Sequence, residues 1–202
     1  MFKISITGKA KSGKNTVAKL LVKELKNNKS YYGHQFIAFA DPIKAMAHQA
    51  FPQIPHRWLY GDSKYRSEII PGAFKDGTAL TVRQLLIDLG NDFGRKYNHN
   101  IWINNFNHSF QKVLILKNHP KKYRNIIIVP DCRRRNEFDF LKSLDFFNIR
   151  ILRDDCTKIN DISETDQDGI MDSEFDVVIH NNGTKSQLEA QVNQIISNLK
   201  EK

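Results

Sequence analysis

The sequence predicts an α/β fold, in which a five-stranded parallel sheet carries helices on both faces. Short apolar runs alternate with segments of helical periodicity along the 202 residues, as expected of such a sheet. A glycine-rich turn joins the first apolar run to the first helical segment. Five apolar runs also end in polar or glycine-rich residues, and ligands of open parallel sheets bind at the carboxyl ends of the strands. These five ends are Gly8–Lys14, Asp41, Asp131, Arg153 and Asn181.

The first strand is expected at residues 2–7, and the apolar residues between Val17 and Leu25 have helical spacing. The turn between them reads GKAKSGKNT, which in this context is typical of a phosphate-binding P-loop. Its backbone N–H groups and the helix start would form an anion cradle. We expect Lys14 to point into this solvent-filled cradle and to reach the β- and γ-phosphates of a nucleoside triphosphate. The candidate triphosphate-binding residues are Gly8, Lys9, Ala10, Lys11, Ser12, Gly13, Lys14, Asn15 and Thr16.

One position departs from the usual P-loop pattern. The residue after Lys14 is Asn15 instead of the usual Ser or Thr, and Thr16 comes next. The amide oxygen of Asn15 could bind Mg²⁺ directly or through a water molecule. The alternative is a glycine-rich strand-to-helix turn that binds no ligand.

A second strand is expected at residues 34–40 and a helix from Asp41, with Asp41 as N-cap and Pro42 at the first helical position. This helix carries Lys44, which suits a solvated helix surface as well as a ligand contact. Residues 51–77 contain several prolines and glycines, and we expect them to be irregular. They carry Lys64 and form either a substrate-binding segment or a surface loop.

Thr81 and Gln84 have the spacing of a capping box, and the apolar face that follows extends to Phe93. Arg83 lies in the first turn of this helix and Arg95 just past its end. They are roughly 18 Å apart if one α-helix runs through, so they could bracket a ligand without sharing one phosphate oxygen. A further helix is expected at 101–116. Its core-facing residues are Trp102, Phe106, Phe110, Val113 and Leu114, which suit packing better than base stacking.

Residues 126–129 form a continuous apolar run, as expected of a central parallel strand. The acidic residue at its end, Asp131, would hold Mg²⁺ through water or orient the attacking oxygen. Arg133 would place positive charge on a transferring or accepting phosphate. Residues two apart in an extended chain point to the same side, so Cys132 is expected to point away into packing. Arg134 and Arg135 are interpreted as a solvated helix start, with a nucleic-acid-binding patch as the alternative.

The C-terminal third is expected to add two strands, at 147–152 and 175–179. Arg153 follows the first, and the polar, acidic stretch 154–174 is expected to be a flexible excursion. Asn181, Asn182 and Gly183 form a turn. Thr184 and Gln187 have the spacing of a second capping box and open the closing helix.

The composition narrows the function classes. A net charge of +9 suits a polyanionic ligand, either a nucleotide or a nucleic acid. Two cysteines give no disulfide framework and suit a reducing compartment. We find no signal peptide and no long apolar span, so we expect a cytoplasmic protein with no membrane partner.

In these motifs the chain resembles the deoxynucleoside monophosphate kinases of tailed phages, which belong to the P-loop nucleoside monophosphate kinases. The resemblance extends over nearly the whole chain. It implies the three-layer fold of those kinases in one domain, 1–202, with a substrate-binding insert at about 42–110 and a lid at about 154–174. It also implies ATP with Mg²⁺ as donor, a deoxynucleoside monophosphate as acceptor and, if the chain is phage-encoded, the host cytoplasm. Its motifs are Gly8–Thr16, Phe39–Lys44, Arg83–Leu86 through Gly90 to Gly94–Arg95 and Trp102, Asp131–Arg133 with Asn136–Glu137, Ser163–Glu164 and Asp176–Thr184.

The expected roles divide between donor and acceptor. The P-loop, with Lys14 as a catalytic residue, would hold the donor, and Asn15, Thr16 and Asp131 would organise Mg²⁺. The other ATP-binding candidates are Arg153, Asn181, Asn182 and Gly183, the last three beside the adenine. The substrate-binding candidates are Asp41, Lys44, Lys64, Arg83, Arg95 and Arg133, and the catalytic set is Lys14, Asp131 and Arg133.

Two alternatives stay open. The P-loop, Asp-x-Arg and Asn-Gly pattern also resembles the animal-type phosphomevalonate kinases, although the segment from Arg83 to Trp102 favours the phage enzymes. A basic P-loop ATPase that binds nucleic acid is the other alternative, and 31 lysines and arginines permit it. Because these cations are scattered, we expect no stable nucleic-acid complex, and a homodimer remains open.

Overall fold

The computed structural model describes residues 1–27, 31–116, 124–156 and 165–200. The chain divides into two compact units. Unit 1 comprises Met1–Ala38 and His108–Lys202, and unit 2 comprises Phe39–Asn107. The roles expected for the insert and the lid stay predictions, and 157–164, within the expected lid and including the Ser163–Glu164 motif, lie outside the described residues.

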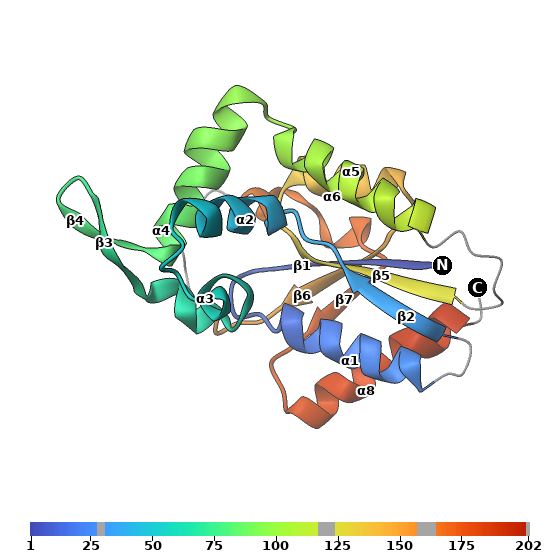
Figure 1. Cartoon of the computed structure of the whole chain (residues 1–202). Coiled ribbons are helices and arrows are strands. Elements are labelled where there is room, and N and C mark those ends of the chain that lie inside the picture. Colours follow the sequence, from blue (N-terminus) through green and yellow to red (C-terminus); the bar gives the residue numbers. More distant parts are fainter. Residues whose placement is uncertain (28–30, 117–123, 157–164, 201–202) are drawn as a thin grey trace. The chain divides into compact units, whose positions relative to one another are not determined.

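Unit 1 is built on a five-stranded parallel sheet with the strand order β2-β5-β1-β6-β7 (Figure 1). The central strand is therefore β1, which leads directly into the glycine-rich loop. Helices cover both faces of the sheet, so the predicted α/β fold class is confirmed. The strands are β1 (Phe2–Gly8), β2 (Tyr31–Phe36), β5 (Arg124–Cys132), β6 (Phe147–Leu152) and β7 (Val177–His180).

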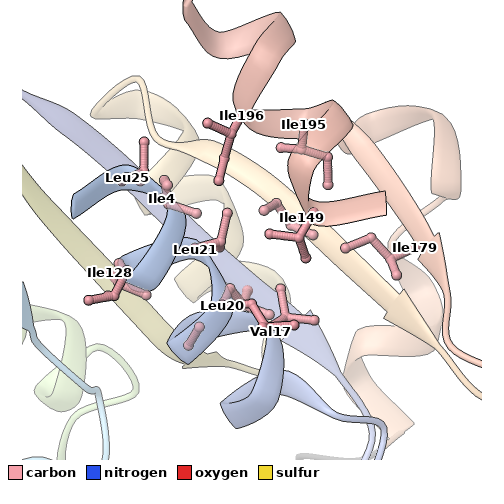
Figure 2. Close-up of a cluster of buried hydrophobic side chains, with 14 of the residues drawn as sticks. Ile4, Val17, Leu20, Leu21, Leu25, Ile128, Ile149, Ile179, Ile195 and Ile196 are labelled. Carbon is pink, nitrogen blue, oxygen red and sulfur yellow. The ribbon is translucent and has the colours of Figure 1, made fainter. Parts of the chain in front are cut away.

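One face of the sheet packs against α1 (Lys14–Lys26) and α8 (Lys185–Lys200). Figure 2 shows the side chains of this core, which come from both helices and from the strands. Their spacing on each helix gives one continuous apolar stripe, which explains why these segments are helical. The fully or nearly fully buried residues of this core include Ile4, Val17, Leu21, Leu25, Ile128, Ile149, Ile179, Ile195 and Ile196.

The other face carries α6 (Arg135–Ser143) and the unit 1 part of α5 (Ile101–Leu116). Aromatic contacts mark this second layer: the rings of Phe110 and Phe146 lie 5.7 Å apart, and those of Phe138 and Phe175 4.8 Å apart. All residues of the 126–129 run are fully buried, as a strand covered on both faces requires.

Local sequence signals mark the ends of α1 and the start of α8. Gly13 is the N-cap of α1, and lysines in its last turn suit the negative end of the helix dipole. The capping box of α8 is confirmed: the Thr184 N–H donates to Gln187 Oε1 at 2.7 Å, and the Gln187 N–H donates to Thr184 Oγ1 at 3.3 Å. None of the helices in the described part of the chain is long and apolar enough to cross a membrane.

Two strands are displaced from their predicted positions. The second runs Tyr31–Phe36 rather than over 34–40, and the last runs Val177–His180 rather than over 175–179. The predicted N-cap at Asp41 is also wrong by one residue. Ala40 caps the helix and its carbonyl accepts the Lys44 N–H at 3.0 Å, so Asp41 already lies in the first turn.

Unit 2 has its own buried apolar cluster, to which Ala47, Ile54, Leu59, Ile70 and Leu85 belong. The prediction that 51–77 is irregular is wrong in part. A hairpin forms there, with Asp76 and Gly77 at φ +50° and +76° in the turn, and an Asp-Gly turn is a known hairpin signal. The elements before α5 are α2 (Asp41–Ala50), α3 (His56–Tyr60), η1 (Ser63–Ser67), β3 (Ile69–Lys75), β4 (Thr78–Thr81), α4 (Val82–Ile87) and η2 (Asp88–Arg95).

The helix that begins after Thr81 changes type along its length. Thr81 Oγ1 accepts the Gln84 N–H at 3.2 Å, as predicted, but the Gln84 side chain donates to Asp88 instead of completing the box. From Asp88 the helix is π-helical, so the 3.6-residue period no longer holds. Phe93 is accordingly 50% exposed and not part of the predicted apolar face.

Candidate active site

The glycine-rich loop connects the end of β1 to the start of α1. Lys11 and Gly13 have positive φ angles, +63° and +107°, so the backbone curls back on itself. Such turns direct successive N–H groups to one side and form anion-binding concavities. A Cβ at Gly8 would lie 2.7 Å from the Ile151 carbonyl oxygen, so only glycine fits there. The backbone of this loop is therefore curled tightly enough to form a concavity that could accept an anion.

Lys14 is folded back into this loop. Its side chain is buried, and its Nζ donates to the carbonyl oxygens of Gly8 and of Lys9, the latter at 2.7 Å. The expectation that Lys14 points into a solvent-filled cradle is therefore wrong. These two hydrogen bonds hold the ammonium group at the loop.

The oxygen atoms expected to bind a metal come from α1 and β5. Asn15 and Thr16 are exposed in the first turn of α1, and Asp131 is half-buried at the end of β5. The register pairs Thr7, next to the loop, with Cys132, next to Asp131. This donor set suits Mg²⁺, which prefers oxygen ligands and usually takes only one or two from the protein. Within the described ranges no group of three or more His, Cys, Asp or Glu side chains could hold a metal ion.

Cys132 is fully buried, as predicted, whereas its neighbours Asp131 and Arg133 are half-buried. Burial raises the pKa of the Cys132 thiol well above its ordinary value, and the Glu137 carboxylate raises it further. The thiol therefore stays neutral near pH 7 and serves packing, not nucleophilic chemistry.

The arginine run after β5 differs in part from the prediction. Arg134 is buried, so the expectation that it is solvated is wrong, whereas Arg135 is exposed and paired with Asp139 and Glu174. Glu137 was not assigned a role from the sequence. Its Oε2 accepts the N–H of Arg133 at 3.0 Å and of Arg134 at 3.2 Å, and this fixes the backbone that carries Arg133. The three-residue spacing from the N-cap was the available signal.

The C-terminal candidates lie at the carboxyl ends of β6 and β7. Asn181 Nδ2 donates to the Ser12 carbonyl of the loop at 2.7 Å. Asn182 instead exchanges hydrogen bonds with Asp154, donating to Oδ2 at 2.8 Å and accepting its N–H at 3.0 Å. Arg153 is exposed.

Two pockets open at this edge of the sheet. A cavity of about 380 Å³ is lined by residues 180–184 and the first turns of α8, and so includes Asn181, Asn182 and Gly183. A second, of about 310 Å³, brings Gly8 and Lys9 together with Arg153. Lys9 also forms an exposed ion pair with Asp168 at 3.0 Å. The structure thus gathers the loop, Arg153 and Asn181–Gly183 at one edge.

Five of the substrate-binding candidates lie in unit 2. Lys44 does not lie on a solvated helix surface, because its side chain is only 17% exposed. Its Nζ pairs with the Asp41 carboxylate at 3.1 Å and lies 5.3 Å from the centre of the Tyr60 ring. Tyr60 was not singled out from the sequence. Its pKa is raised by burial and by the negative charge of Asp41. Lys64 is exposed, with its Nζ 5.1 Å from the ring centre of its neighbour Tyr65.

Arg83 and Arg95 are both half-buried. Arg83 lies in the first turn of α4, and Arg95 ends the π-helical η2, where its Nη1 donates to the His99 carbonyl at 3.0 Å. Because the helix changes type between them, the 18 Å separation expected for one α-helix does not apply. This segment packs closely against Trp102. A Cβ at Gly94 would collide with the Trp102 ring, and Trp102 Nε1 donates to the Gly90 carbonyl at 2.8 Å.

Comparison with known proteins gives the family. Residues 62–192 match the family model described as deoxynucleotide monophosphate kinase. A protein of Acanthamoeba polyphaga mimivirus described as "Putative deoxynucleotide monophosphate kinase" is 27% identical over 205 residues, which cover 98% of this chain and 97% of the viral protein. The resemblance found in the sequence motifs is thereby confirmed. Since the family model matches more than half of the chain, the chain belongs to the deoxynucleotide monophosphate kinase family and is a nucleotide kinase.

Proposed function

We propose that this protein transfers the γ-phosphoryl group of ATP to a deoxynucleoside monophosphate and releases ADP and the deoxynucleoside diphosphate. The observation that carries the proposal is the Gly8–Thr16 loop, with positive φ angles at Lys11 and Gly13 and the buried ammonium group of Lys14. Family membership supports a nucleotide acceptor over phosphomevalonate or a nucleic acid.

Donor binding is assigned to unit 1. The loop N–H groups and Lys14 hold the triphosphate, and Lys14 exchanges the loop carbonyls for phosphate oxygens. The cavity beside Asn181–Gly183 receives the adenine, and Arg153 lies beside the second pocket, close to the loop. The residues that would hold Mg²⁺ are Asn15, Thr16 and Asp131. Bound there, the metal would neutralise charge on the phosphates.

Acceptor binding is assigned to the unit 2 cations Arg83 and Arg95, with Asp41, Lys44 and Lys64 contributing, and to Arg133 of unit 1. An acceptor phosphate oxygen attacks the γ-phosphorus as the bond to the ADP oxygen breaks. Phosphoryl transfer needs positioning and charge neutralisation more than covalent chemistry, so no protein nucleophile is required. The neutral, buried thiol of Cys132 agrees with that.

A coupled ADP-release assay with ATP, Mg²⁺ and a panel of nucleoside and deoxynucleoside monophosphates tests the proposal. We expect release with at least one deoxynucleoside monophosphate, and much less with phosphomevalonate or single-stranded DNA. Failure of every monophosphate to stimulate ADP release by the folded protein would refute it. Release with phosphomevalonate or DNA alone would instead support one of the alternatives.

A further inference from the structure

Asn181 makes a contact with the loop although it lies outside the glycine-rich motif. Its Nδ2 donates to the Ser12 carbonyl at 2.7 Å, across 169 positions of the chain. The orientation of the amide is fixed by chemistry, because a carbonyl oxygen accepts only and must face the NH₂ group. The backbone of Asn181 is anchored as well, since its N–H donates to the Leu152 carbonyl at 2.8 Å. The end of β7 therefore provides a fixed donor to the loop.

This contact determines how one peptide group of the loop is turned. The Ser12–Gly13 peptide is trans, and in a trans peptide the C=O and the N–H point in opposite directions. By holding the Ser12 carbonyl, Asn181 turns the Gly13 N–H away from itself. The Ser12 N–H is fixed separately, because it donates to the Lys9 carbonyl at 3.1 Å. One amide side chain thus constrains the Ser12–Gly13 peptide, which lies one residue before Lys14.

The absence of a side chain at Gly13 fits the same arrangement. A Cβ at Gly13 would collide with Asn181 Nδ2. Gly13 is thus required twice, for its φ angle of +107° and for the space that the Asn181 amide fills. The amide is also neutral and so adds no negative charge where phosphates bind. An aspartate there would lose the donor when ionised and would repel them.

We propose that Asn181 is a positioning residue, which preorganises the loop for the triphosphate by holding the Ser12 carbonyl. The inference rests on the proposed function, because it assumes that the loop binds the phosphates of ATP. It changes the role expected for Asn181 from the sequence, which was a contact beside the adenine.

A ligand without a base separates these two roles. Tripolyphosphate can occupy the loop but cannot fill the cavity lined by Asn181–Gly183. We would measure dissociation constants for ATP and tripolyphosphate, and the KM for the monophosphate, with wild type, Asn181→Ala and Asn181→Asp. Asn193, which is exposed on α8, gives matched controls as Asn193→Ala and Asn193→Asp. Circular dichroism and thermal melts verify that each variant is folded.

We expect both Asn181 variants to bind ATP and tripolyphosphate about tenfold more weakly, with Asn181→Asp the weaker, and an unchanged monophosphate KM. We also expect a shift of the Gly13 amide resonance in Asn181→Ala without ligand. Loss of ATP affinity alone, with tripolyphosphate binding intact, would overturn positioning in favour of a base contact. Unchanged affinity for both, in a protein that binds ATP, would also overturn it. A wild type that binds neither ligand would instead refute the proposed function itself.

Discussion

The loop of unit 1 and the cationic side chains of unit 2 are held in place by different kinds of contact. Lys14 is held by carbonyls of the loop that it follows in sequence, five and six residues away. Lys44 is held by the Asp41 carboxylate and by the ring of Tyr60, which comes from another helix. The position of the Lys14 ammonium group therefore depends on the local fold of the loop, whereas the position of the Lys44 ammonium group depends in part on packing between two helices. If the loop serves the donor and these cations the acceptor, substitutions in the two regions should have different kinetic signatures.

Lys14→Ala should have the largest effect, a loss on the order of 10³-fold in kcat/KM, because the loop loses the charge that neutralises the transferring phosphate. Since Lys14 also donates to two carbonyls, we expect a stability cost of about 1 kcal/mol. Coupled ADP release and a denaturant melt measure the two effects. Lys19→Ala, an exposed lysine on the same helix, is the control. Near-normal turnover by Lys14→Ala would show that the loop does not hold the donor.

Arg133→Ala and Asp131→Asn should fail in different ways. Arg133→Ala should lower kcat by on the order of 10²-fold at any Mg²⁺ concentration, through lost charge stabilisation. Asp131→Asn should lower kcat and raise the Mg²⁺ concentration needed for half-maximal rate, with ATP still bound through the loop. Magnesium titrations of both variants make the comparison. Identical titration curves for wild type and Asp131→Asn would remove Asp131 from the metal site.

Arg83→Ala and Arg95→Ala should weaken the binding of the monophosphate much more than the binding of ATP. We expect the KM for the monophosphate to rise about tenfold, equivalent to about 1.4 kcal/mol of binding free energy, and the KM for ATP to change much less. Lys96→Ala removes an exposed charge next to Arg95 and is the matched control. Equal increases for both substrates would contradict the assignment of these arginines to the acceptor.

Cys132→Ser should have the smallest effect on the reaction. A hydroxyl group in place of the buried thiol should cost about 1–3 kcal/mol of stability and leave kcat nearly unchanged. Because the pKa of the thiol is raised by burial, Cys132 should also resist a thiol-specific reagent at pH 8 in the folded state, while unfolding exposes it. Loss of activity in Cys132→Ser with normal activity in the Asp131 and Arg133 variants would mean that the strand faces the opposite way.

The predictability of each region follows from the range of its contacts. The five-stranded parallel sheet and the loop follow from apolar runs and one motif, so the sheet, α1 and the capping box of α8 were predictable, whereas the strand order was not predicted. The Asp76-Gly77 hairpin was predictable too, but prolines and glycines nearby concealed it. The π-helical turn at Asp88–Arg95 was not, because it has no period that a short window reveals.

Within the site, the charged residues could be predicted from the sequence, but most of their hydrogen bonds could not. It singled out Lys14, but not that loop carbonyls bury its ammonium group. It placed Asn181 near the nucleotide, whereas the hydrogen bond to Ser12 joins segments 169 positions apart. Glu137 accepts the Arg133 N–H as part of a helix cap, and the Tyr60 ring lies beside the Lys44 ammonium group. The residue type alone indicates neither contact.

The most direct test of the central claim follows the γ-phosphate itself. The wild-type protein, incubated with ATP labelled at the γ-phosphate, Mg²⁺ and each deoxynucleoside monophosphate in turn, would be analysed by chromatography of the products. We expect label in the β-phosphate of a deoxynucleoside diphosphate, and transfer by Lys14→Ala that is slower on the order of 10³-fold. Label found only in inorganic phosphate, whichever monophosphate is present, would contradict the central claim.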